Sequence, residues 1–85
     1  MEKQQLANEI AIYIKDKLFA GNVPESFNND STLISSRLLN SIVVLGMVND
    51  LEEKYKVDFE AHEVNVDNFD SINKTADFIF QKLSK

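Results

Sequence analysis

The chain has 85 residues, a net charge of −5 and no cysteine. This length predicts a single domain over residues 1–85, with one thin core and no deep catalytic cavity. The lack of cysteine excludes disulfides, thiolate metal sites and thiol nucleophiles, and the acidic balance argues against nucleic acid as a partner. The polar N-terminus does not resemble a signal peptide, and no apolar run approaches the length of a membrane span. We therefore expect a cytoplasmic monomer without membrane insertion.

The first predicted helix covers residues 3–18. Apolar side chains recur there at every fourth position, as on a helix with one buried face: Leu6, Ile10, Ile14 and Leu18. Ile12 falls outside this stripe and indicates either a wider buried face or contact with a partner. Gly21 and Pro24 favour the end of the helix shortly before them.

The segment 19–40 is predicted to be a long ordered loop with room for one short helical turn. It is rich in Asn, Ser and Asp, and a loop of this length in a compact domain must be tied to the core. Apolar side chains spaced through the segment are the expected anchors: Val23, Phe27, Leu33, Ile34, Leu38 and Leu39.

The second long helix is predicted over residues 41–55. Its core face gathers five side chains: Val44, Met47, Val48, Leu51 and Tyr55. The opposite face gathers Ile42, Gly46, Asn49 and Glu53, with Val43 and Leu45 on its flanks. This helix therefore also presents apolar residues outward, all near its start. Gly46 costs about 1 kcal/mol relative to Ala inside a helix, which indicates close approach by a partner or close packing against another helix.

Residues 56–70 are predicted to form a second connector with a short third helix. Its apolar anchors are Val57, Phe59, Val64, Val66 and Phe69. The last helix is predicted over residues 71–83, with a stripe of Ile72, Ala76, Ile79 and Leu83 that Phe78 and Phe80 widen. Together these elements predict an all-α fold: a small antiparallel four-helix bundle of three longer helices and one short one.

The residue patterns of enzymes do not occur in the sequence, so we expect no enzymatic activity. The single histidine, His62, stands in a polar connector without the further ligands of a metal site or the orienting group of a catalytic triad. This context favours an ordinary surface residue. A calcium loop starting at Asp58 fails, because Glu63 stands where that loop requires glycine.

Ser41 is the residue whose position suggests chemistry, because it lies where a polar loop turns into an amphipathic helix. One interpretation is an N-cap, in which the serine oxygen accepts from the free N–H groups of the first turn. The other uses the same geometry: a helix N-terminus stabilises an attached phosphate through those N–H groups and the helix dipole.

Three stretches carry a resemblance to a known family. They are Asn40-Ser41-Ile42 at the start of the second helix, Leu51-Glu52-Glu53-Lys54-Tyr55 at its end, and Asn68-Phe69-Asp70-Ser71-Ile72 before the last helix. Together with the order of helices and loops, they give the whole chain a pattern that resembles acyl carrier proteins, in which Asp-Ser-Leu opens the second helix.

The resemblance has two departures and one refinement. Asn40 stands where the family usually has Asp, which keeps the capping ability and loses the charge. Arg37 and Leu38 stand where a glycine is usual. The pair Leu38-Leu39 is similar to D-alanyl carriers and to freestanding carriers of peptide-synthetase-like pathways.

The resemblance implies that Ser41 carries a covalent 4'-phosphopantetheine arm, whose thiol holds an acyl or aminoacyl cargo as a thioester. The implied partners are a phosphopantetheinyl transferase, an adenylating enzyme that loads the cargo, and a downstream transferase or synthase. They are expected to dock around the serine on Asn40, Ile42, Val43, Leu45, Gly46, Asn49, Glu52 and Glu53. The alternative is a carrier-like interaction module that is never modified and docks through the same helix.

A competing serine has to be weighed, because Asp70-Ser71-Ile72 matches the family tripeptide more closely. Ser71 opens the last helix, however, whereas the family's serine opens the second long helix near the middle of the chain. We therefore predict that Ser71 caps the last helix, with Asp70 favouring its N-terminus, and that Ser41 is the attachment point.

Overall fold

The computed structural model describes residues 2–83 of the chain. Its helices are α1 (Lys3–Tyr13), continued by a π-helical turn η1 (Ile14–Leu18), α2 (Ser41–Tyr55), α3 (Val66–Phe69) and α4 (Ile72–Leu83), with a 3₁₀ turn η2 (Ala61–Glu63) before α3. This part of the chain contains no strand. The predicted all-α fold of three longer helices and one short one is confirmed.

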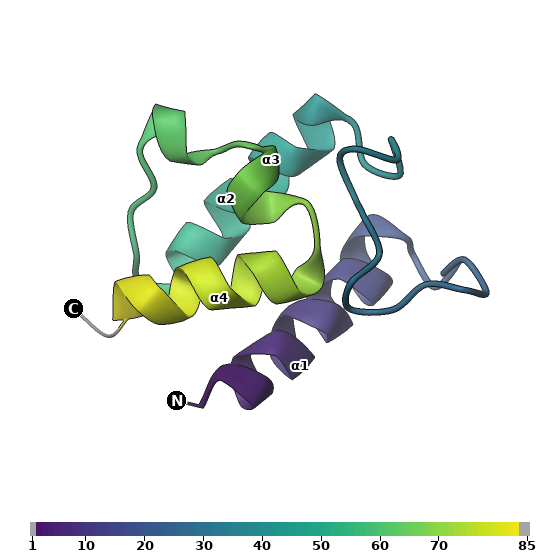
Figure 1. Ribbon diagram of the computed structural model, residues 1–85, viewed down its shortest axis with the longest axis horizontal. Coiled ribbons are helices and arrows are strands. Elements are labelled where there is room, and N and C mark those ends of the chain that lie inside the picture. Colours follow the sequence, from purple (N-terminus) through teal and green to yellow (C-terminus); the bar gives the residue numbers. More distant parts are fainter. Residues whose placement is uncertain (1, 84–85) are drawn as a thin grey trace.

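The three longer helices surround one core, with α1 running opposite to both α2 and α4 (Figure 1). In Figure 1, α1 runs from the lower left toward the right, whereas α2 and α4 run back from right to left. The backbones of α1 and α4 approach each other closely, and the short α3 packs against α4. The long loop between α1 and α2 occupies the right-hand side of the molecule (Figure 1).

The core consists of the apolar faces that the helical periods predict. All five predicted core residues of α2 are buried, and so are Leu6, Ile10 and Ile14 of the first helix. Two predictions at helix ends are wrong in part, because Leu18 is only half-buried and Leu83 is exposed. Ile12 is 61% exposed, which excludes the wider buried face and leaves contact with a partner as its interpretation.

The end of the first helix follows the predicted stop signals. The last turn widens into a π-helical turn, in which the N–H of Phe19 donates to the carbonyl of Ile14 at 3.0 Å. Gly21 then adopts a left-handed conformation with φ +84°, and its N–H donates to the carbonyl of Lys15 at 3.0 Å. Glycine adopts this conformation without steric cost, so the helix ends where the sequence indicates.

Two tyrosines tie α1 to α2 in the antiparallel arrangement. The Tyr13 hydroxyl donates to Asp50 at 2.6 Å, and the Tyr55 hydroxyl donates to Glu9 at 2.9 Å. Burial and these carboxylates raise the pKa of both hydroxyls above the ordinary tyrosine value, so both stay protonated as donors. The two links lie about one turn apart on each helix and join the second half of α2 to α1.

The loop over residues 19–40 is ordered and contains no helical turn, contrary to that part of the prediction. Leu33 and Leu39 are buried anchors as predicted, and Phe27 and Ile34 pack partly against the core. Leu38 is not an anchor, because its side chain is exposed.

A carboxylate that the sequence did not single out for this role holds the loop to the rest of the fold. Asp70, between α3 and α4, is only 4% exposed. Its Oδ1 accepts from the backbone N–H groups of Leu33, Ile34 and Ser35 at 3.2, 2.8 and 2.9 Å, and its Oδ2 accepts from the Ser35 hydroxyl at 2.6 Å. Both oxygens of Asp70 are thus bound to the loop, while its charge still lies directly before the cap of α4.

Candidate functional site: the start of α2 and the adjoining pocket

The first turn of α2 is capped by Asn40. The Asn40 backbone is extended, and its side-chain Oδ1 accepts from the N–H of Val43 at 2.9 Å. Ser41 is the first residue inside the helix. The interpretation of Ser41 as the N-cap is therefore wrong by one residue, and its hydroxyl has no capping duty.

Ser41 is exposed on this first turn. The N–H groups of the first residues of a helix have no acceptor within the helix, and they make this end of the helix dipole favourable for a negative group. Asn40 caps the helix as an uncharged amide, so it adds no carboxylate beside the serine. The Ser41 hydroxyl is therefore exposed at the positive end of the helix dipole.

Ser71 has the opposite environment. It is 3% exposed, and its Oγ accepts from the N–H of Lys74 at 3.0 Å, the geometry of a cap before α4. The prediction that Ser71 caps the last helix is confirmed. A buried hydroxyl engaged in a cap cannot be presented to a modifying enzyme, which removes the competing candidate.

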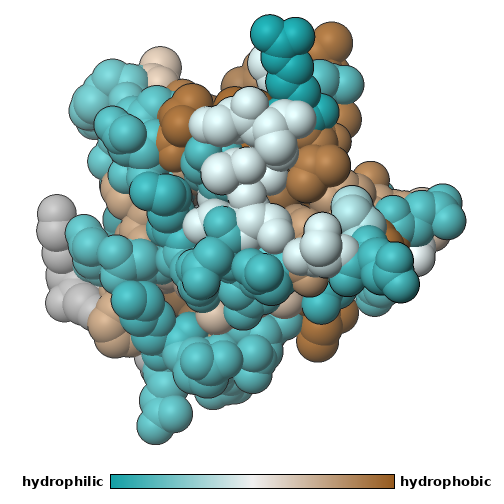
Figure 2. Space-filling model, turned by 45° about the vertical axis from the view of Figure 1, so that its right-hand side comes forward, coloured by the Kyte–Doolittle hydropathy of each residue, from teal (hydrophilic) through white to brown (hydrophobic). Residues whose placement is uncertain are grey.

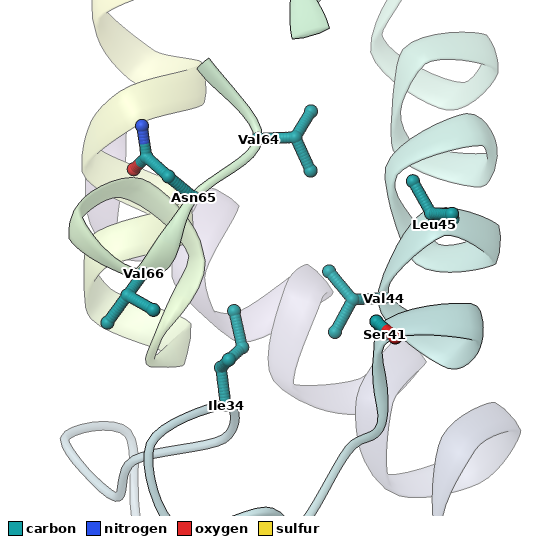
Figure 3. Close-up of a pocket in the computed structure, with 7 residues that line it drawn as sticks. All are labelled: Ile34, Ser41, Val44, Leu45, Val64, Asn65 and Val66. Atoms are coloured by element: carbon teal, nitrogen blue, oxygen red, sulfur yellow. The ribbon is translucent and has the colours of Figure 1, made fainter. Parts of the chain in front are cut away.

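A pocket of about 300 Å³ opens next to Ser41. Three parts of the chain line it, as Figure 3 shows: the loop with Ile34, the start of α2 with Ser41, Val44 and Leu45, and the segment leading into α3 with Val64, Asn65 and Val66. The side chains of Ile34, Val44 and Val64 point toward one another across the space (Figure 3).

The pocket is apolar apart from the serine hydroxyl. Asn65 is the other polar residue of the lining, but its side chain caps α3 by accepting from the N–H of Asn68 at 3.0 Å and donates to the carbonyl of His62 at 2.8 Å. Figure 3 shows this side chain directed away from the space between the valines. The pocket therefore offers aliphatic walls with one free hydroxyl at its edge.

Two residues of the pocket lining, Leu45 and Val66, are exposed hydrophobics, and two more exposed hydrophobics lie close to Ser41 in sequence. Ile42 is 81% exposed and Leu45 is 56% exposed, and Leu38 and Val66 are exposed as well. Figure 2 shows hydrophobic areas in the upper half of the face that it presents, above a largely hydrophilic lower half. Exposed apolar side chains beside an apolar pocket are typical of interaction sites.

The structure separates the predicted docking residues into two groups. Most are exposed on α2 or at its cap: Asn40, Ile42, Leu45, Gly46, Asn49 and Glu53. Val43 packs partly against the core, and Glu52 is half-buried and accepts from the N–H of Phe59 at 2.8 Å. A Cβ added at Gly46 would meet nothing within 4 Å, which excludes close helix packing as the reason for this glycine.

The remaining predicted features lie apart from this site. His62 is an exposed surface residue beside Glu60, as expected. Residues 2–83 contain no group of three or more histidine, cysteine or acidic side chains that could hold a metal ion. Within the same residues, no helix is both long enough and apolar enough to cross a membrane.

Sequence reasoning found one side of the pocket and missed the other. The helical period of α2 predicted where Ser41, Val44 and Leu45 lie on the helix. The other three aliphatic residues of the lining were predicted only as anchors of the connectors: Ile34, Val64 and Val66. These three residues lie in connectors without helical or strand periodicity, so the sequence does not indicate that their side chains meet in one pocket.

Comparison of the chain with models of known protein families gave no match, and neither did comparison with curated proteins. The function is therefore inferred from the geometry of the site and from the resemblance of the sequence pattern.

Proposed function

We propose that this chain is a carrier protein, in which a flexible arm attached to one side chain presents a cargo to several enzymes. More particularly, we propose an acyl carrier whose arm is 4'-phosphopantetheine on Ser41. The observation that carries the proposal is the state of Ser41: exposed, free of capping, and first in a long helix beside an apolar pocket.

The residues around Ser41 suit the attachment of a phosphodiester. In the proposed step, the Ser41 oxygen attacks the phosphorus of coenzyme A next to the pantetheine, and 3',5'-adenosine bisphosphate leaves while the hydroxyl proton passes to a base of the transferase. The N–H groups at the start of α2 and the helix dipole then stabilise the phosphate that remains on the serine. When attached, the arm supplies a thiol that holds an acyl group as a thioester.

The lining of the pocket bears on the cargo. It has five aliphatic side chains and no charged residue, so an ammonium group placed inside would lose its hydration without gaining a carboxylate. An uncharged aliphatic group gains by burial there. Of the two cargo classes that the resemblance implies, this lining favours acyl over aminoacyl groups.

The exposed side chains near Ser41 suit partner recognition. Ile42, Leu45 and Val66 are exposed apolar residues near the serine, and we call them the apolar rim. Partner enzymes would contact this rim through hydrophobic surface; the partners are the transferase, the adenylating enzyme and the downstream transferase or synthase. Tethering raises the effective concentration of the cargo at each docked enzyme, and the chain itself needs no catalytic group.

An unmodified interaction module is the second candidate. It would use the same apolar rim, and the feature that favours it is Asn40, which gives a transferase no carboxylate to recognise beside the serine. The structure of the cap is unaffected by this difference, because the amide oxygen of Asn40 accepts from Val43 as a carboxylate oxygen would.

One experiment separates the two candidates. The purified protein is incubated with coenzyme A, magnesium and a broad-specificity phosphopantetheinyl transferase, and its intact mass is measured. A carrier gains the mass of one phosphopantetheine in the wild type and in Ser71→Ala, provided that this variant folds, and gains nothing in Ser41→Ala. No gain in the wild type with several transferases, under conditions that modify a known carrier, would overturn the carrier proposal and favour the interaction module.

A further inference from the structure

Asp70 connects two walls of the pocket that are far apart in sequence. Its carboxylate accepts from the N–H of Ile34, a residue of the loop wall, at 2.8 Å. Its own N–H donates to the carbonyl of Val66, a residue of the α3 wall, at 3.1 Å. Through one residue, the loop and α3 are held at a fixed separation.

The same residue also reaches the start of α2. The N–H of Leu33 donates to the Asp70 carbonyl at 2.6 Å as well as to its carboxylate, and the carbonyl of Leu33 accepts from the N–H of Leu39 at 2.9 Å. Leu39 is buried and directly precedes Asn40, the cap of α2. A continuous set of hydrogen bonds therefore runs from Asp70 to Leu39, the residue directly before the cap of α2.

The binding of the carboxylate is strong enough to make this connection rigid. Three successive backbone N–H groups converge on one carboxylate oxygen, an anion-binding arrangement of the backbone, and hydrogen bonds to an ionised group are stronger than neutral ones. Burial alone would raise the pKa of Asp70, but the hydrogen bonds from the Ser35 hydroxyl and the three amides outweigh it and hold the pKa below its ordinary value. The group therefore stays ionised at neutral pH.

We propose that Asp70 is a positioning residue for the pocket beside Ser41: its carboxylate, enclosed by residues 33–35, sets the separation of the loop and α3 walls and so the shape of the pocket. This role is a property of the unmodified protein. The result of its test therefore does not depend on whether a transferase attaches phosphopantetheine to Ser41.

The test compares Asp70→Ala and Asp70→Asn with the wild type and with a matched control, Asp67→Asn. Asp67 is an exposed carboxylate on α3, so its variant removes the same charge from the same region. Hydrogen exchange of backbone amides is followed by NMR. Binding of a neutral apolar probe, N-phenyl-1-naphthylamine, is followed through the methyl signals of Val44 and Val64.

In Asp70→Ala, we expect exchange at Ile34 and Ser35 to rise about ten-fold or more, since each amide loses a charged acceptor. Amides in the middle of α1 and α2 should change by less than about two-fold, because those helices do not touch the carboxylate. The Kd of the probe should change by at least about three-fold, with altered methyl shifts, because the lining is displaced. Asp70→Asn should lie between, since its amide oxygen still accepts, and Asp67→Asn should match the wild type.

Two results would overturn the proposal. In the first, the loop amides are freed while the Kd and methyl shifts of the probe remain those of the wild type, so that Asp70 orders the loop without shaping the pocket. In the second, exchange rises equally in all helices, which is a purely global effect on stability. If Asp70→Ala does not fold, Asp70→Asn and Ser35→Ala, which removes only the bond to Oδ2, carry the same comparison.

Discussion

Alanine replacements at Asn40 and Ser41 should affect different properties: Asn40→Ala the stability of the fold, and Ser41→Ala the modification. Asn40→Ala removes the oxygen that accepts from the N–H of Val43 at 2.9 Å, and loss of such a cap costs about 1 kcal/mol, within a range of about 0.5–2 kcal/mol. Ser41→Ala removes an exposed hydroxyl that has no capping role, and such surface changes stay within about 0.5 kcal/mol. Ser41→Ala should nevertheless abolish attachment of phosphopantetheine.

The measurement is urea unfolding followed by far-UV circular dichroism, with the three proteins at one pH and one salt concentration. A cost of about 1 kcal/mol lowers Tm by about 4–8 °C in a domain of this size, which a parallel thermal scan resolves easily. Ser71→Ala is the positive control, because it removes the buried cap of α4. It should cost about 1 kcal/mol or more, as Asn40→Ala does.

The reasoning would be refuted if Ser41→Ala lost as much unfolding free energy as Asn40→Ala at an unchanged m-value. Ser41 would then carry the cap after all, and loss of modification in Ser41→Ala could no longer be separated from loss of the first turn of α2. If instead Asn40→Ala were as stable as the wild type, the hydrogen bond to Val43 would contribute nothing in solution.

Four further outcomes are expected. Asn40→Asp keeps the cap, adds negative charge at the helix N-terminus and should stabilise the fold by about 0.3–1 kcal/mol while raising the transferase rate, measured by mass spectrometry over time. Gly46→Ala should raise the unfolding free energy by about 1 kcal/mol in urea titrations, because its Cβ meets open space. The pKa of Asp70 is lowered in the fold. Its contribution to the unfolding free energy should therefore be full above the ordinary carboxyl pKa of about 4 and be lost as the pH falls below it. The difference in unfolding free energy between wild type and Asp70→Asn, measured in urea at several pH values, checks this. Ile42→Ala should raise the KM of the transferase, whereas Ile12→Ala, a control at another exposed isoleucine on α1, should leave the KM unchanged; equal effects would contradict docking at α2.

The helices were predictable because the buried face of each one follows from the spacing of apolar residues within its own segment. The core face of α2 follows from a period of 3.6 residues, and every side chain assigned to it is buried. The same period separated the exposed Ile12 from its buried neighbours on α1. Errors fall at helix ends, such as Leu83, where a stripe can continue past the last neighbouring element that could cover it.

The loop and the pocket were less predictable because their determinants are distant in sequence. Leu38 and Leu39 have identical side chains, yet only Leu39 is buried. The N–H of Leu39 donates to the carbonyl of Leu33, a residue that Asp70 binds. Asp70 lies 35–37 residues from the amides that it binds. Within its own segment it looks like an ordinary acidic residue before a helix, so a local pattern could not reveal this function.

The two related tripeptides, Asn40-Ser41-Ile42 and Asp70-Ser71-Ile72, show how one residue of register separates a site from a structural cap. In the first, the helix begins at the serine, Asn40 caps it and the hydroxyl stays free. In the second, the helix begins at the isoleucine, so Ser71 itself is the cap and the carboxylate before it turns to the loop. Asn, Asp and Ser are nearly equivalent as caps, so the tripeptides alone do not decide between these registers. Tertiary burial of Ser71 and Asp70 decides the second, and the absence of any such burial at Ser41 leaves its hydroxyl exposed, as the proposed attachment requires.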